Sequence, residues 1–356
     1  MAKGYDNKLE PDLAVLVGVN CLETDLDELG LLCQTCNIKA IACVIQNRKD
    51  VDVTYYVGKG KVDEIKQLVE QHKATAVVFD VELSGSKVRN LEDVLGVPVL
   101  DRSKIILDIF AQRAQSMEGK LQVELAQLKY NLPRLVGSGG LMSKMKTSVG
   151  MRGPGEKKLE LDKRTIRDQI VELERKIAKV SETRNLSKVR ANKSGKSRVC
   201  IVGYTNSGKS TLLNTISKAG VTAEDKLFAT LDPKTVNVYI EGHQILLTDT
   251  VGFINKLPHE FIRAFESTLD EAKYADLLLH VVDISNPNHM QQIVVVNEVL
   301  GKIGASEIPT LMVYNKSDIN QGYKADGEKD SVVISARKNQ GIDNLKQKII
   351  EFITKQ

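Results

Sequence analysis

The sequence predicts an α/β protein in three parts: an N-terminal parallel α/β subdomain, a helical hairpin, and a doubly wound α/β domain. Short apolar runs of strand length alternate with helical patterns over residues 13–101 and again from Val199 onward. Such alternation favours parallel sheets with helical crossovers. The stretch between them has helical spacing without a strand signal. At 356 residues the chain is also longer than one hydrophobic core usually serves.

The N-terminal subdomain is predicted to span residues 1–108. Its strand-length apolar runs are separated by patterns of helical period, as a parallel sheet requires. The expected strands are Leu13–Val19, Ala40–Ile45, Ala76–Asp80 and Val97–Leu100. The expected helices are Asp25–Cys36, Lys61–His72 and Lys87–Leu95.

The helical hairpin is predicted to span residues 109–190. Apolar residues at helical spacing continue as far as Pro133, which ends that pattern. A second helix is expected from Glu156 to Arg184, with partial heptad spacing that favours antiparallel packing. The Gly-rich stretch 137–155 would form the tip loop, with basic residues Lys144, Lys146 and Arg152 and no acid. Residues 184–198 are a linker candidate or a nucleic-acid contact.

The third part, residues 191–356, opens with a phosphate-binding motif. The sequence from Gly203 to Ser210 matches G-x-x-x-x-G-K-[ST], between a strand-like run and a helical pattern. Backbone N–H groups of such a loop meet phosphates, Lys209 is expected to reach the β- and γ-phosphates, and Ser210 to bind Mg²⁺. The expected phosphate-side residues are Gly203, Asn206, Ser207, Gly208, Lys209, Ser210 and Thr211.

Three later strand ends indicate that the nucleotide is a guanine nucleotide, GTP or GDP. Asp249-Thr-Val-Gly252 is a D-x-x-G motif whose carboxylate can hold Mg²⁺ and whose glycine N–H can meet the γ-phosphate. Asn315-Lys316-Ser-Asp318 is an N-K-x-D motif. Its carboxylate can accept from guanine N1–H and N2–H₂, Asn315 can serve the O6/N7 edge, and the Lys316 stem can cover the base. Ser335-Ala336 ends the last strand, where a backbone N–H can meet O6.

A threonine between these motifs completes the expected site. Thr230, in Phe228-Ala-Thr-Leu-Asp232, can join Mg²⁺ coordination and sense the γ-phosphate as part of a switch loop. The predicted metal ligands are therefore Ser210, Thr230 and Asp249. The predicted catalytic residues are Lys209, Thr230 and Gly252.

Position 253 bears on the rate of hydrolysis. Many GTPases carry a glutamine after the D-x-x-G glycine to orient the attacking water, and Phe253 cannot do so. We therefore expect slow GTP hydrolysis by the isolated chain, with the water positioned by the switch backbone or by a partner. On this interpretation Phe253→Ala would leave GTP affinity largely intact.

Charge is concentrated in one segment. Residues 102–198 hold 23 basic and 10 acidic side chains, a net of +13, whereas the whole chain carries only +4. A polyanion is the first candidate partner, and ribosomal RNA suits the segment because Lys and Arg bind phosphate by releasing counterions. Aromatic residues are few there, so contacts to the RNA backbone are favoured over base stacking.

Four cysteines cluster near the N-terminus: Cys21, Cys33, Cys36 and Cys43. A zinc or redox site at the C-x-x-C is one interpretation. Burial as small hydrophobic residues is favoured, because zinc spacing normally comes as two C-x-x-C pairs. No apolar run reaches the roughly 20 residues that span a bilayer, and no signal peptide is evident. We expect a cytoplasmic protein, and a monomer.

Taken with upstream segments, these motifs resemble the HflX family of GTPases in the Obg–HflX group, over nearly the whole chain. The upstream matches include Tyr56-Val-Gly-Lys-Gly-Lys61, Asp108-Ile-Phe-Ala-Gln-Arg-Ala114 and Arg152-Gly-Pro-Gly-Glu156. The resemblance implies a P-loop GTPase domain behind a two-part N-terminal region. It also implies binding to the large ribosomal subunit, with a role in ribosome dissociation or rescue under stress. Residues 137–150 depart from the family's pattern in being longer and more basic, and we expect no counterpart of the C-terminal extension of some relatives.

Two alternatives stay open. A regulatory GTPase switch would act through a protein effector bound by the N-terminal region. Alternatively, the N-terminal part would hold a second nucleotide site for ATP- or GTP-dependent RNA remodelling. Gly58-Lys-Gly60 is the phosphate-loop-like feature there, although an ordinary turn explains it better because no full motif surrounds it.

Overall fold

The computed structural model describes residues 11–135, 154–192, 196–217, 227–228, 230–256, 271–320, 322–323 and 330–354. Residues 137–153 of the predicted tip loop 137–155 lie outside them, and the last two residues of that prediction belong to a helix. The chain divides into two compact units. One comprises Met1–Ile109 with Gln127–Ile170, and the other Phe110–Ala126 with Val171–Gln356. Three helices, α4, α5 and α7, contribute residues to both units.

The first unit contains a four-stranded sheet in the order β2-β1-β3-β4, in which every pair is parallel. Its strands are β1 (Asp12–Val19), β2 (Ile38–Gln46), β3 (Ala76–Phe79) and β4 (Val99–Asp101). Its crossover helices are α1 (Glu23–Thr35), α2 (Lys59–His72) and α3 (Gly85–Leu95). These elements lie within a few residues of the predicted ones.

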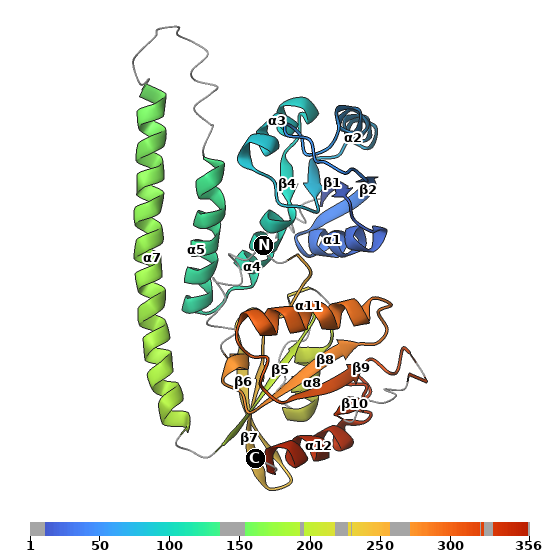
Figure 1. Cartoon of the computed structure of the whole chain (residues 1–356), viewed down its shortest axis with the longest axis vertical. Helices are drawn as coiled ribbons and strands as arrows, with labels where there is room; N and C mark the ends of the chain where they lie inside the picture. The colour runs from blue at the N-terminus through green and yellow to red at the C-terminus, as the bar shows by residue number, and fades with distance from the viewer. Residues whose placement is uncertain are drawn as a thin grey trace, which may run out of the picture. The chain divides into compact units, whose positions relative to one another are not determined.

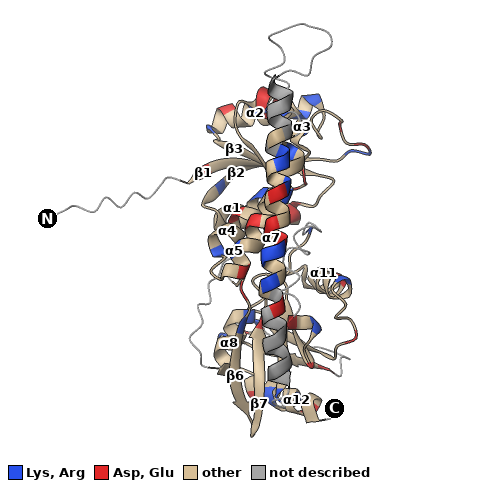
Figure 2. Cartoon of the chain, turned by 90° about the vertical axis from the view of Figure 1, so that its left-hand side faces the viewer, with Lys and Arg blue, Asp and Glu red and all other residues tan. Residues whose placement is uncertain are grey.

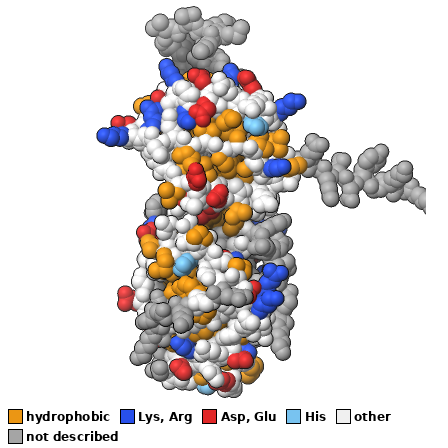
Figure 3. All heavy atoms as spheres, turned by 90° about the vertical axis from the view of Figure 1, so that its right-hand side faces the viewer, with side chains coloured by type: hydrophobic (Ala, Val, Ile, Leu, Met, Phe, Trp, Pro, Cys, Tyr) orange, Lys and Arg blue, Asp and Glu red, His pale blue; other side chains and the backbone are white. Residues whose placement is uncertain are grey.

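Alternation along β1 divides the core of this sheet into two layers. Val15 and Val17 belong to the cluster that includes residues of α2 and α3. Leu16, buried between them in sequence, points to the other face, where α1 lies. Figure 1 shows α1 on one side of the sheet and α2 and α3 on the other. Strand β2 forms one edge of this sheet. Figure 3 shows that some hydrophobic side chains lie at the surface of the molecule.

The middle of the chain is helical, as predicted. Pro133 lies inside the last turn of α5, one residue before its end, where the lost N–H costs a single hydrogen bond. Helix α7 runs eight residues past the predicted end, so residues 184–192, a linker candidate in the sequence, are helical. Figure 2 shows that positions of basic and acidic residues alternate along the described part of α7. The helices are α4 (Arg102–Arg113), α5 (Met117–Arg134) and α7 (Pro154–Asn192).

The second unit contains a six-stranded sheet in the order β10-β9-β8-β5-β7-β6. All neighbours are parallel except the β6–β7 hairpin at one edge. The strands are β5 (Ser197–Gly203), β6 (Lys234–Ile240), β7 (His243–Asp249), β8 (Leu277–Asp283), β9 (Thr310–Asn315) and β10 (Ser331–Val333). The helices are α8 (Lys209–Ser217), α11 (His289–Lys302) and α12 (Ile342–Thr354).

Helices cover both faces of this sheet. Leu212 of α8 and Leu345 of α12 belong to one apolar cluster with the inward residues of β5, β7 and β8. The alternate residues of β8 and β9, Val282 and Tyr314, pack on the opposite face with Ile293 of α11, and Figure 1 shows α11 in front of the sheet. The predicted fold class is confirmed. No helix among the described residues is long and apolar enough to cross a membrane.

Candidate nucleotide site

The loop between β5 and α8 has the shape of a phosphate cradle. It begins where β5 ends, at Gly203, and leads into Lys209, the first residue of α8. Gly208 has φ 96°, and a Cβ there would lie 2.3 Å from Asn315 Nδ2, so only glycine fits. The Ser207 hydroxyl oxygen is buried, and the described residues offer it no hydrogen-bond partner. An orphan polar atom in such a loop fits a site built around a ligand.

Lys209 lies buried within this loop. Its Nζ donates to the carbonyl oxygens of Gly203 at 3.2 Å and Tyr204 at 2.7 Å. Burial lowers the pKa of Lys209 to about 8, and the negative charge of Asp249 opposes that shift. A buried ammonium group with neutral carbonyl partners gains strongly from an anion. The loop therefore favours a phosphate group.

The three predicted metal ligands come together beside this lysine. The Ser210 Oγ donates to Asp249 Oδ2 at 2.7 Å and the Thr230 Oγ1 to the same oxygen at 3.0 Å. The two hydroxyl oxygens lie 2.8 Å apart. Asp249 Oδ1 is buried and has no partner among the described residues. Burial raises the pKa of Asp249, against the opposing charge of Lys209. Two hydroxyl oxygens beside a carboxylate that has one unsatisfied oxygen are hard donors of the kind that Mg²⁺ prefers.

Gly252 lies directly against the phosphate loop. A Cβ at this position would lie 2.8 Å from Thr205 Cα and 3.0 Å from Lys209 Nζ, so the close approach requires glycine. The next residue, Phe253, pairs with the loop through its backbone: its N–H donates to Gly203 O at 3.1 Å, and its carbonyl accepts from Thr205 N–H at 2.7 Å. The D-x-x-G segment is thus joined to the phosphate loop by a short parallel bridge.

The Phe253 side chain is buried, with only 1% of its surface exposed. It therefore belongs to the packing under the site. Truncation to alanine would remove core contacts as well as the side chain next to the switch glycine. Phe253→Ala is consequently a weaker test of water positioning than the sequence alone indicates.

The strand ends predicted to read the base meet at the other end of the loop. The Asn315 Nδ2 donates to Ser207 O at 2.9 Å, and its Oδ1 accepts from the Ala336 N–H at 3.0 Å. One amide thus joins the phosphate loop to the loop after β10. Asp318 Oδ1 accepts from the Ser335 Oγ at 2.6 Å. The structure therefore brings Asn315, Asp318, Ser335 and Ala336 together.

Sequence reasoning missed two charged or polar residues at this site. Asp283 ends β8 and pairs with Lys316 Nζ at 2.6 Å, which fixes the lysine stem. His280, inside the same strand, is buried, and the described residues offer its Nδ1 no partner. Burial, with a smaller contribution from Lys209, lowers the pKa of His280 to about 4, so the imidazole is neutral at pH 7. A histidine inside an apolar strand and a carboxylate at its end were the available signals.

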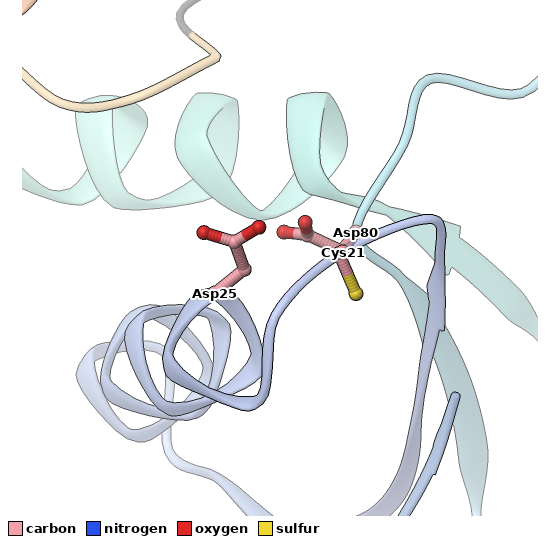
Figure 4. A group of neighbouring side chains, drawn as sticks. All are labelled: Cys21, Asp25 and Asp80. Carbon is pink, nitrogen blue, oxygen red and sulfur yellow. The ribbon is translucent and has the colours of Figure 1, made fainter. Parts of the chain in front are cut away.

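The cysteine region offers one group with metal-ligand spacing. Atoms of Cys21, Asp25 and Asp80 lie within 4.8 Å of one another, at the carboxyl ends of β1 and β3 (Figure 4). Asp80 already pairs with Arg102 Nη1 at 2.7 Å. That cation offsets the negative charge a metal ion would need, so Asp80 is best explained as a member of a buried ion pair, beside the partly buried Cys21 and Asp25.

The C-x-x-C residues are not part of that group. Cys33 is buried in α1, and burial raises its pKa to about 12. Burial also raises the pKa of Cys36 to about 11, whereas Cys43 lies exposed on β2. Thiols with such high pKa values are poor ligands and nucleophiles at neutral pH.

Family models match most of the chain. The model described as "GTP-binding GTPase N-terminal" matches residues 23–111, and "GTP-binding GTPase Middle Region" matches residues 113–190. The model "50S ribosome-binding GTPase" matches residues 198–316.

Curated relatives agree with the family models. "GTPase HflX" of Caldanaerobacter subterraneus subsp. tengcongensis is 47% identical over 344 residues, which cover 96% of this chain and 80% of the relative. The chain belongs to the HflX family of GTPases. The Escherichia coli "GTPase HflX" is 42% identical to this HflX chain over 338 residues, covering 93% of the chain and 79% of the relative.

A solved structure extends the similarity to three dimensions. The complex of SsGBP with GDP is 27% identical to this HflX chain, with a TM-score of 0.51. It covers 97% of this chain and 99% of the solved one. Membership of this GTPase family makes the chain a GTP-hydrolysing enzyme, which binds GTP and GDP.

Proposed function

We propose that this HflX chain, as a cytoplasmic monomer, couples GTP hydrolysis to association with the large ribosomal subunit, in ribosome dissociation or rescue under stress. The observation that carries the proposal is the meeting of Ser210, Thr230 and Asp249 beside Lys209 in a domain that matches the "50S ribosome-binding GTPase" model. A switch residue held at the metal position gives the nucleotide a means of controlling binding.

The residues of the site have separate roles in this proposal. Lys209 would bind the β- and γ-phosphates and offset charge that develops between them, and the Gly252 N–H would donate to the γ-phosphate. Ser210, Thr230 and Asp249 would hold Mg²⁺, which supplies positive charge to the phosphate oxygens. Asp318 would accept from guanine N1–H and N2–H₂, while Asn315 braces the loops on either side.

Hydrolysis by the isolated chain is expected to be slow. Phe253 is buried, and its backbone is paired with the phosphate loop, so this position supplies no side chain to orient water. A partner that orders the switch segment would raise the rate. The large subunit is the partner proposed here.

The basic segment 102–198 is the proposed contact with ribosomal RNA. Two arginines of this segment form salt bridges within the protein. Arg102 pairs with Asp80, and Arg134 pairs with Asp101 at 2.8 Å. Others, including Arg164 and Arg167 of α7, are exposed. Affinity is expected to come from exposed charges of this kind and to fall steeply with salt.

Co-sedimentation with purified ribosomal subunits tests the proposal. We expect the chain to pellet with the large subunit in a non-hydrolysable GTP analogue and to do so more weakly in GDP. Binding that is equal in all nucleotide states, or absent, would refute it. If the chain instead retains a protein effector in the GTP state and ignores the subunits, the regulatory-switch alternative holds.

Reversing the charge of exposed arginines on α7 tests whether this helix contacts the large subunit. Arg164→Glu with Arg167→Glu should weaken large-subunit binding at physiological salt by about tenfold or more and reduce the salt slope. The matched control reverses exposed lysines on the two α/β domains, Lys66→Glu with Lys302→Glu. Equal losses in both variants would show that net charge, and not this helix, governs binding.

The second-nucleotide-site alternative has its own test. Gly58 lies at the N-cap of α2 without a surrounding Walker motif. ATP turnover that survives Lys209→Ala in the full chain would support a site there, whereas its loss would assign all turnover to the GTPase domain.

A further inference from the structure

Residues before and after Thr230 in the sequence both contact the corner between α4 and α5. The corner residues, 110–126, belong to the same compact unit as the GTPase domain. Phe228 precedes Thr230 by two residues, and Asp232 follows it by two. Each of them contacts this corner, while Thr230 itself points to Ser210 and Asp249.

Asp232 binds the start of α5 through both carboxylate oxygens. Its Oδ2 accepts from the backbone N–H groups of Gln115 at 2.9 Å and Ser116 at 2.8 Å. Its Oδ1 accepts from the Ser116 hydroxyl. Helix α5 begins at Met117, so the carboxylate sits where the first N–H groups of a helix have no intrahelical partner and where the helix dipole favours negative charge.

Ser116 takes part both in the N-cap of α5 and in the contact with Asp232. Its Oγ accepts from the Gly119 N–H at 2.9 Å, which is the hydrogen bond of a helix N-cap. The same hydroxyl donates its proton to Asp232. The cap of α5 and the hold on the switch segment therefore share one side chain, and loss of either partner disturbs the other.

Gly119 leaves room for this contact. A Cβ at position 119 would lie 2.5 Å from Asp232 Oδ1 and 3.1 Å from Ser116 Oγ. Glycine is otherwise unfavourable inside a helix. The close approach of the Asp232 carboxylate explains why a glycine occupies the first turn of α5.

An aromatic contact holds the other end of the segment. The rings of Phe228 and Phe110 meet edge to face, with centroids 4.7 Å apart, and both side chains are almost fully buried. Phe228 has φ 54°, a conformation that bulky residues rarely adopt and that persists only when packing enforces it. The α4 ring supplies part of that packing.

We propose that Asp232 is a positioning residue for GTP hydrolysis, which holds Thr230 at the metal site by binding the N-terminus of α5. The start of α5 therefore binds the switch segment when Thr230 lies at the metal site. The proposal rests on the GTPase activity of the family and not on the ribosome function. Because the test below contains no ribosomes, a negative result for Asp232 would not bear on the proposed ribosome function, and the reverse also holds.

The test measures the single-turnover GTP hydrolysis rate, GDP affinity and the Mg²⁺ concentration for half-maximal rate in the full chain. Asp232→Ala should lower the rate by about tenfold or more, because a displaced catalytic group costs that much, and should raise the Mg²⁺ requirement. GDP affinity should stay unchanged. Asp232→Asn keeps an oxygen acceptor for the two N–H groups and should recover most of the rate.

Gly119→Ala displaces the carboxylate without removing any hydrogen-bonding group, and should lower the rate in the same way. The matched control is Gly301→Ala in α11, where the added Cβ would meet only Ser306 Oγ at 3.6 Å, an ordinary contact. In the Asp232→Ala background, Gly119→Ala should have no further effect. Unchanged rates, additive losses in the double variant, or GDP affinity that falls in parallel with the rate would overturn the proposal.

Discussion

At the residue scale, single side chains join parts of the nucleotide site that are far apart in sequence. The Asn315 amide connects the phosphate loop to the loop after β10, and Ser335 fixes one oxygen of the Asp318 carboxylate. The motif predicted which residues gather at the site. It did not predict that both ends of the Asn315 amide are engaged by the protein, because its partners are backbone atoms that no motif specifies.

Asp318→Asn should change the base that the site prefers. The Asn Oδ1 can still accept from the Ser335 hydroxyl, as Asp318 Oδ1 does at 2.6 Å, which turns the amide Nδ2 toward the base. An N–H₂ group cannot accept from guanine N1–H and N2–H₂ but can donate to the C2 carbonyl of xanthine. We expect GDP affinity to fall by about tenfold or more and xanthosine diphosphate affinity to rise.

Competition between the two diphosphates, followed by fluorescence of a labelled nucleotide, checks this. Ser335→Ala is the informative companion, since it frees the carboxylate without altering its charge and should weaken both nucleotides only modestly. An Asp318→Asn variant that still prefers GDP would place the guanine contact elsewhere.

At the element scale, the sites depend on where strands end. In both sheets the carboxyl ends of parallel strands gather polar side chains, as doubly wound folds require. In the N-terminal sheet these side chains are neutralised internally: Arg102, at the start of α4, joins Asp80 at the end of β3 and Glu28 of α1. In the GTPase sheet, Ser207 Oγ and Asp249 Oδ1 have no partner among the described residues, so a ligand can meet them.

The Arg102–Asp80 pair should matter strongly for the stability of the N-terminal domain. Asp80 is fully buried, and the Arg102 side chain is 4% exposed, so Arg102→Ala removes a buried cation from a buried carboxylate. We expect a loss of about 3–5 kcal/mol in the unfolding free energy. Scanning calorimetry of the full chain with GDP present, which moves the GTPase transition upward, isolates the N-terminal transition.

The pair Lys61–Glu64 in α2 is the less buried comparison, with side chains 20% and 50% exposed and a 2.7 Å contact in the same domain. Lys61→Ala should cost less than about 1 kcal/mol. Similar melting temperatures for the two variants would show that the buried pair is not a principal stabilising contact.

At the scale of the whole molecule, sequence reasoning predicted the fold class and the gathering of the nucleotide residues, because period and strand-end motifs are local signals. It could not predict the Asp232–Ser116 contact, since the two residues are 116 positions apart and a capping serine does not specify its partner. Nor did it predict that α7 continues to Asn192, because the basic residues there suit both a linker and a helix.

The charge pattern was also only partly informative. The net of +13 over residues 102–198 includes Arg102 and Arg134, which the structure places in internal ion pairs. A count of charges cannot separate buried from exposed arginines. Exposed basic residues such as Arg164 and Arg167 of α7 are the kind that a polyanion can contact.

The proposed coupling to the ribosome is tested by the GTP hydrolysis rate of the full chain with and without purified large ribosomal subunits. We expect slow turnover alone, a rise of about tenfold or more with the subunits, and loss of both the slow and the stimulated turnover in Lys209→Ala. A rate that large subunits leave unchanged, together with turnover that survives Lys209→Ala, would contradict it.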